Sequence, residues 1–232
     1  MNIILQIVQN ETTISDSLVN SVNSTSTALD ALSLVLKGGI VMIPIGILSI
    51  IAVYLTIERY FTIKKAGVLD SAFMGNIKGM VLNGDIKSAQ TLCHSNGTPI
   101  GLMIEKGLSR IGKPLKDISV AVENVGKLEV YKLEKGMPIL ATISGAAPML
   151  GFLGTVTGMI RTFNQMQDSG QQITADLLSG GIGEAMMTTV AGLIVGIFAY
   201  IGYNLLSSMI NKVVYKMEAT SVEFLDILHE PA

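Results

Sequence analysis

Two apolar stretches of this chain, residues 138–160 and 184–208, carry few polar side chains, and only one of these ionises. That residue is Glu184, at the start of the second stretch. A carboxylate at bilayer depth costs a few kcal/mol on insertion scales, so Glu184 is expected to face a protein interior or an aqueous cavity. Alternatively, Glu184 caps the outer end of its helix, where the helix dipole favours an acid.

Threonine hydroxyls near this acid could line a narrow path for water and ions. Thr188 lies one turn beyond Glu184 on the same helical face, and Thr189 is rotated from Thr188 by about 100°. In the preceding stretch, Thr155 and Thr157 flank a run of small residues. Threonines in apolar helices also bond to carbonyl groups of their own helix or simply pack. On the residues alone, a pore-lining role and a packing role both stay open.

The small residues of the first stretch form a regular pattern. Steps of four, three and four separate Ala147, Gly151, Gly154 and Gly158. This spacing places all of them on one face of a helix and predicts close contact with another helix.

The two apolar stretches carry too few titratable groups for an ion carrier that works as a single chain. A proton or sodium carrier requires a titratable group deep in the membrane, and these stretches offer none beyond Glu184. We therefore expect the shuttling carboxylate on another chain. A single-chain pump is disfavoured, and no inverted repeat relates the apolar stretches.

Composition sets the protein class. The 232 residues are 49% hydrophobic and 15% charged, which is typical of an integral membrane protein. The formal charge of −2 gives no basic field for nucleic acid. Cys93 and His94 are adjacent in a polar loop and His229 lies in the tail, too few ligands for a metal site. We expect neither enzyme activity nor a cofactor.

Three apolar stretches are long enough to cross a bilayer. The predicted membrane spans are 38–59, 138–160 and 184–208, and Pro44 is expected to kink the first. Of 16 basic residues, 12 lie between Arg59 and Lys135 and two follow the third span. By the positive-inside rule, loop 60–137 and tail 209–232 are cytoplasmic. The N-terminal segment 1–37, read as an interfacial helix, and the connection 161–183 are then periplasmic.

The inner loop and the tail are expected to be helical. Apolar residues recur at helical spacing from Ile118 to Leu128 and predict a helix that runs on toward Met137. Glycine and proline near residues 83–84, 97–99 and 112–114 divide the rest of the loop into short helices. The predicted fold is an all-α membrane protein whose second and third spans have long cytoplasmic extensions.

Residues 147–163 (APMLGFLGTVTGMIRTF) and 180–204 (GGIGEAMMTTVAGLIVGIFAYIGYN) resemble the MotA/TolQ/ExbB proton-channel family. The order of spans is similar to the three-span ExbB/TolQ branch, whereas the MotA branch usually has four. Phe198 stands where many relatives have a proline, so a family kink in the third span is not expected here.

The resemblance implies a homopentameric ring in the bacterial inner membrane. Its second and third spans would surround two ExbD- or TolR-like chains, whose membrane Asp takes up and releases protons. Position by position, Thr155, Glu184 and Thr189 would face that Asp, with Thr188 and Thr157 adding polarity.

The resemblance also implies the function. The leading hypothesis is an ExbB-like motor subunit that, through a TonB-like protein, energises TonB-dependent transport across the outer membrane. One alternative is a TolQ-like subunit of the Tol-Pal envelope system, acting on a TolA-like protein. Another is a non-conducting membrane scaffold, which would need the small-residue stripe but not the polar residues.

Overall fold

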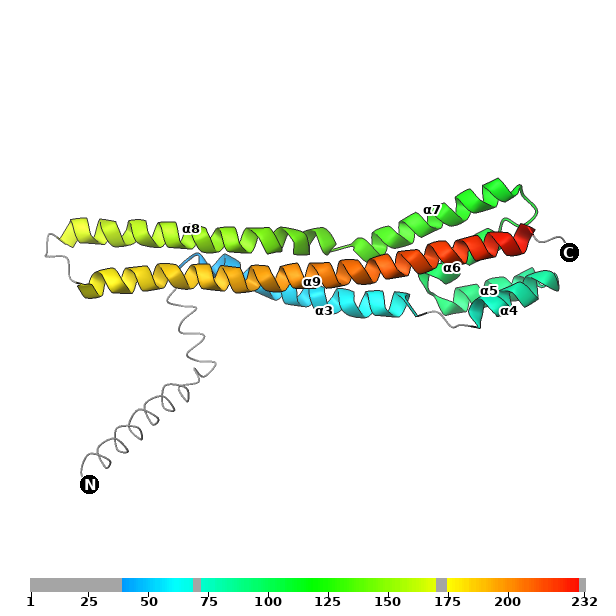
Figure 1. Ribbon diagram of the computed structural model, residues 1–232, viewed down its shortest axis with the longest axis horizontal. Coiled ribbons are helices and arrows are strands. Elements are labelled where there is room, and N and C mark those ends of the chain that lie inside the picture. Colours follow the sequence, from blue (N-terminus) through cyan, green and yellow to red (C-terminus); the bar gives the residue numbers. More distant parts are fainter. Residues whose placement is uncertain (1–38, 69–71, 170–174, 230–232) are drawn as a thin grey trace, which may run out of the picture. The chain divides into compact units, whose positions relative to one another are not determined.

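The computed structural model describes residues 39–68, 72–169 and 175–229, and the regular structure within these ranges is entirely helical. The all-α class is therefore confirmed, while the predicted segment 1–37 lies outside the described residues. Figure 1 shows the helices in chain order. Their bounds are α3 Met42–Ala66, α4 Phe73–Leu82, α5 Ile86–Asn96, α6 Pro99–Leu108, α7 Leu115–Glu134, α8 Met137–Ser169 and α9 Ala175–His229.

Three described segments are long and apolar enough to cross a membrane, as the sequence predicts. They are α3, the segment Leu115–Gln167 that contains α7 and most of α8, and Gly180–His229 within α9. The kink expected at Pro44 is not required, because α3 begins at Met42 and Pro44 lies in its first turn. The first N–H groups of a helix have no intrahelical acceptor, so a proline there loses no hydrogen bond.

The helices continue beyond the apolar stretches. Because α8 ends at Ser169 and α9 begins at Ala175, most of the segment 161–183, expected as a connection, is helical. Hydropathy marks the part of a helix that suits lipid and not the residue at which the helix ends. The 55 residues of α9 extend over about 80 Å at about 1.5 Å each, well beyond a hydrocarbon layer of about 30 Å.

The extension that precedes the second span is interrupted. The helix expected to run on toward Met137 ends at Glu134, and α8 begins two residues after Lys135. Gly136 adopts a φ of 88°, a left-handed conformation that glycine tolerates because it lacks a Cβ atom. Pro138 has no N–H to donate to the Glu134 carbonyl, so a continuous helix would lose that hydrogen bond.

The chain forms two compact units. Among the described residues, one unit combines 153–169 and 175–189 with 39–42, and the other combines 43–68 and 72–152 with 190–229. In the second unit, α4, α5, α6 and α7 lie around the C-terminal part of α9 (Figure 1). Phe224 of α9 is fully buried in the core that these helices form. Other side chains of this core include Ile77, Ile104, Leu108 and Val122.

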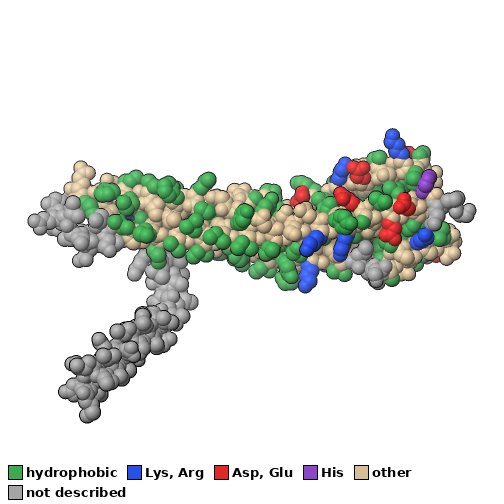
Figure 2. Space-filling model, in the orientation of Figure 1, with side chains coloured by type: hydrophobic (Ala, Val, Ile, Leu, Met, Phe, Trp, Pro, Cys, Tyr) green, Lys and Arg blue, Asp and Glu red, His purple; other side chains and the backbone are tan. Residues whose placement is uncertain are grey.

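The short helices of the second unit are separated where the sequence predicts. After α5, Gly97 adopts a φ of 60°, and Pro99 occupies the first turn of α6. Between them, the Thr98 side chain accepts a hydrogen bond from the Gly101 N–H at 3.2 Å and caps α6. Figure 2 shows charged side chains gathered over this helical cluster, as expected for a domain in water.

Candidate functional site

In the first unit, α8 and α9 meet through a ladder of small residues. On each rung, a Cβ atom added to a glycine would lie closer than 3 Å to the partner side chain. The rungs are Gly154 with Thr188, Gly158 with Ala185, and Gly181 with Thr162. Residue numbers rise along α8 as they fall along α9, so the two helices are antiparallel.

The second unit contains contacts of the same kind. A Cβ atom at Gly192 would lie 2.5 Å from the Ala147 carbonyl oxygen and 2.9 Å from Gly151 Cα. One at Gly196 would lie 2.6 Å from the Pro148 ring, within α8. Glycine thus allows backbone and ring atoms to approach closely. All members of the predicted small-residue stripe lie at such contacts: Ala147, Gly151, Gly154 and Gly158.

The partner stripe on α9 was not recognised from the sequence, although a signal for it exists. Its small residues recur at steps of four, three, four and four, namely Gly181, Ala185, Thr188, Gly192 and Gly196. Contacts this close leave no room for water between the two helices. An ion path must therefore run along the outside of the pair and not through it.

Thr188 belongs to the contact itself. Its side chain is 1% exposed, and its Oγ1 donates a hydrogen bond to the Ala185 carbonyl at 2.7 Å. The rest of the side chain packs over Gly154. Within a single subunit, Thr188 therefore fills space between the helices.

Thr155 and Thr189 turn to the same side of the helix pair. Each follows a contact residue directly, Thr155 after Gly154 and Thr189 after Thr188, and one residue corresponds to about 100° of rotation. Viewed from one end of the pair, the chain turns clockwise along one helix and anticlockwise along the other, because the two helices are antiparallel. The step from Gly154 to Thr155 and the step from Thr188 to Thr189 therefore both lead to the same side of the pair. Both side chains are half-buried. The structure thus brings together two of the five predicted pathway residues.

Thr157 lies on the other side. It follows Gly154 by three residues, which is a rotation of about 60° in the opposite sense. It lines a cavity of about 110 Å³ together with Gly39–Val41, the segment that leads into α3. Its Oγ1 donates to the Leu153 carbonyl at 2.9 Å and is 3.2 Å from the Gly154 carbonyl.

The backbone of Glu184 belongs to α9, between the rungs of Gly181 and Ala185, and its side chain lies outside the described residues. Elsewhere, the described residues contain no group of three or more acidic, histidine or cysteine side chains placed to hold a metal. Burial and the nearby Glu105 carboxylate raise the pKa of Cys93 to about 12.

Comparison with known proteins relates this geometry to a family. The model of the MotA/TolQ/ExbB proton channel family matches residues 95–219, which include the α8–α9 ladder. The chain is 32% identical over 176 residues to an ExbB-like biopolymer transport protein of Synechocystis, with 75% of this chain and 69% of the relative covered.

Two shorter matches point to two branches of the family. The chain is 35% identical over 104 residues to the Tol-Pal system protein TolQ of Haemophilus influenzae, which covers 45% of each protein. It is 37% identical over 90 residues to the biopolymer transport protein exbB1 of Vibrio cholerae, with 39% of this chain and 40% of the relative covered.

Proposed function

Because this chain belongs to the MotA/TolQ/ExbB proton channel family, we propose that it is an ExbB-like subunit of a motor driven by the proton-motive force. With an ExbD-like single-span partner and a TonB-like protein, it energises TonB-dependent transport across the outer membrane. The subunits form a homopentameric ring in the bacterial inner membrane. The N-terminus is periplasmic and the C-terminus is cytoplasmic.

The shared orientation of Thr155 and Thr189 carries this proposal. The glycine contacts seal the space between α8 and α9, so polar groups can serve an ion path only from an outer side of the pair. Thr155 and Thr189 lie on one such side, and Thr157 lies on the side that faces the segment before α3. A ring that turns the Thr155 side inward surrounds its partner with hydroxyl groups.

In this ring, the partner's carboxylate exchanges protons at the polar surface of Thr155, Glu184 and Thr189. Thr188 supports the surface by fixing the contact with Gly154, and Thr157 adds polarity near α3. Each proton supplies about 2.3 kcal/mol per 100 mV of membrane potential. That energy moves the partner inside the ring, and the partner's outer domain passes the work on.

The TolQ-like role is the second candidate. The match to a TolQ protein is of about the same length and identity as the match to an exbB1 protein, so sequence similarity favours neither role. The two roles differ in the protein that receives the work, which is TonB-like in one case and TolA-like in the other. Co-purification of the native complex with one of these proteins distinguishes them.

Uptake of a TonB-dependent substrate tests the proposal. The chain and its cognate partner are expressed in cells that lack their own motor, and uptake is compared among variants that assemble equally well. We expect Glu184→Ala and Thr189→Val to abolish uptake. Thr142→Val is the matched control, because Thr142 is an exposed threonine of α8 whose hydroxyl donates to the Pro138 carbonyl. Full activity of both test variants would favour the scaffold alternative.

A further inference from the structure

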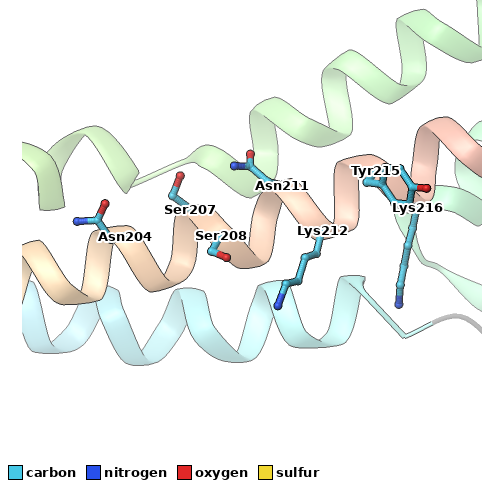
Figure 3. A pocket seen from close by; sticks show the side chains of 7 residues that line it. All are labelled: Asn204, Ser207, Ser208, Asn211, Lys212, Tyr215 and Lys216. Atoms are coloured by element: carbon cyan, nitrogen blue, oxygen red, sulfur yellow. The ribbon is translucent and has the colours of Figure 1, made fainter.

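A polar surface pocket lies along α9 in the second unit. Its volume is about 690 Å³, and it is lined by two lysines, two asparagines, two serines and a tyrosine, all from α9 (Figure 3). No acidic residue lines it. The pocket therefore combines positive charge with hydrogen-bond donors, which suits an anion.

The two lysines are arranged to act together. Ser208, Lys212 and Lys216 follow one another at steps of four and form one stripe on the helix. Figure 3 shows Lys212 and Lys216 extending from α9 in the same direction. The Lys216 Nζ donates a hydrogen bond to the Gly67 carbonyl at 3.1 Å, which holds this ammonium group at the end of α3. One cation is thus fixed beside a second.

The positive charge here is not neutralised within the described part of the chain. Lys212 forms no ion pair there, and neither do Lys64 and Lys65 in the last turn of α3. A Cβ atom on Gly67 would lie 3.3 Å from Val213, so the end of α3 lies beside the turn that carries Lys212. The neighbouring lysines of α3 therefore add to the positive potential at the pocket.

Apolar side chains are exposed on the membrane side of these lysines. On α9, Ile201 and Leu205 precede the pocket and are 52% and 62% exposed. On α3, Ile57 and Phe61 precede the lysines and are 53% and 65% exposed. The predicted third span ends at residue 208, within the run of residues that lines the pocket. A ligand here meets apolar surface on one side and cations on the other.

We propose that this pocket binds the phosphate group of an anionic phospholipid, with the acyl chains against the exposed apolar residues of α9 and α3. Lys212 and Lys216 contact the phosphate, and Ser208, on the same stripe, donates a hydrogen bond to the headgroup. Juxtamembrane lysines attract anionic lipids through the negative surface potential of the leaflet. Placement in the inner leaflet rests on the proposed orientation, whereas binding itself does not.

The test is a lipid-association measurement on the full-length protein in phosphatidylcholine bilayers. Electron paramagnetic resonance of spin-labelled lipids gives the association of phosphatidylglycerol relative to phosphatidylcholine. We expect the wild type to prefer phosphatidylglycerol and the double variant Lys212→Gln/Lys216→Gln to lose about fivefold or more of that preference. The charge-conserving variant Lys212→Arg/Lys216→Arg should keep most of it.

A matched control separates this pocket from general surface charge. Lys113→Gln/Lys116→Gln removes the same charge from exposed residues between α6 and the first turn of α7, and it should keep the wild-type preference. The proposal would be overturned if both double Gln variants lost the phosphatidylglycerol preference equally. It would also be overturned if Lys212→Gln/Lys216→Gln lost none of that preference. Displacement of labelled phosphatidylglycerol by inorganic phosphate would instead assign the pocket to a soluble anion. Because none of these readouts requires a motor partner, failure here leaves the proposed function standing.

Discussion

The Thr188 side chain occupies the space that a side chain at Gly154 would need. This contact fixes the rotation of α8 against α9, since each helix can approach the other only with these two positions facing. The residues that follow them, Thr155 and Thr189, then turn to one side. A packing contact thereby determines which polar groups a neighbouring chain meets.

We predict that Gly154→Ala disrupts this contact. The added Cβ would lie 2.6 Å from the Thr188 Cβ, which no side-chain rotation of Thr188 can move away, so the helices must separate. Overpacking of this kind typically costs about 1–3 kcal/mol. The thermal unfolding midpoint of the purified protein should fall. Gly145→Ala, on the same helix with nothing within 4 Å, should leave the midpoint unchanged or raise it slightly, because alanine favours the helix more than glycine does. Equal midpoints for the two variants would contradict the ladder.

The helical cluster of the second unit offers a parallel test. An added Cβ at Gly107 would clash with the Phe224 ring and would lie 2.9 Å from Val122 Cγ2, and both of these side chains are fully buried. Gly107→Ala should therefore destabilise the cluster by about 1–3 kcal/mol, as measured by chemical denaturation. Gly79→Ala introduces the same methyl group into open space on α4, and we expect it to be neutral or stabilising by up to about 1 kcal/mol.

Cys93 should react slowly with maleimides in the folded protein. The thiolate is the reactive form, and a pKa raised to about 12 by burial and by Glu105 leaves very little thiolate at pH 8. Because the raised pKa belongs to the folded state, denaturant should restore ordinary reactivity, and labelling should also accelerate as the pH rises. The variant Cys93→Ser/Ser95→Cys moves the thiol to an exposed position and should label rapidly without denaturant. Fast labelling of native Cys93 would contradict its burial.

The proposed orientation predicts from which side of the membrane a reagent can label the inner loop. In a Cys93→Ser background, Lys113→Cys places a thiol at an exposed position between α6 and α7. A membrane-impermeant maleimide should label it in inverted membrane vesicles and not in intact spheroplasts. Labelling in spheroplasts would place loop 60–137 in the periplasm and reverse the assignment of both termini.

Much of the fold follows from local sequence patterns. Apolar length predicts the three candidate spans, and glycine and proline mark where the short inner helices end. The interruption before Met137 was not predicted, because apolar residues at helical spacing indicate which face of a helix is apolar and not whether the helix continues. The interruption depends on the left-handed conformation of Gly136.

The candidate site is harder to predict from the sequence than the fold is. The small-residue stripe of α8 is visible as a spacing, but its partner stripe on α9 matters only once the two helices are known to be antiparallel neighbours. Without the family resemblance, the residue types alone do not distinguish Thr155, Thr157, Thr188 and Thr189 from one another. Tertiary packing places Thr155 and Thr189 on one side of the helix pair, Thr157 on the other side and Thr188 in the contact between the helices.

Site-directed photo-cross-linking to the single-span partner tests the central claim most directly. A photoreactive amino acid is placed at position 155, 189 or 157 in the complex within its native membrane. We predict partner adducts from 155 and 189, because both lie on the side proposed to face the ring interior, and few or none from 157. Adducts from 157 without adducts from 155 and 189 would contradict the account.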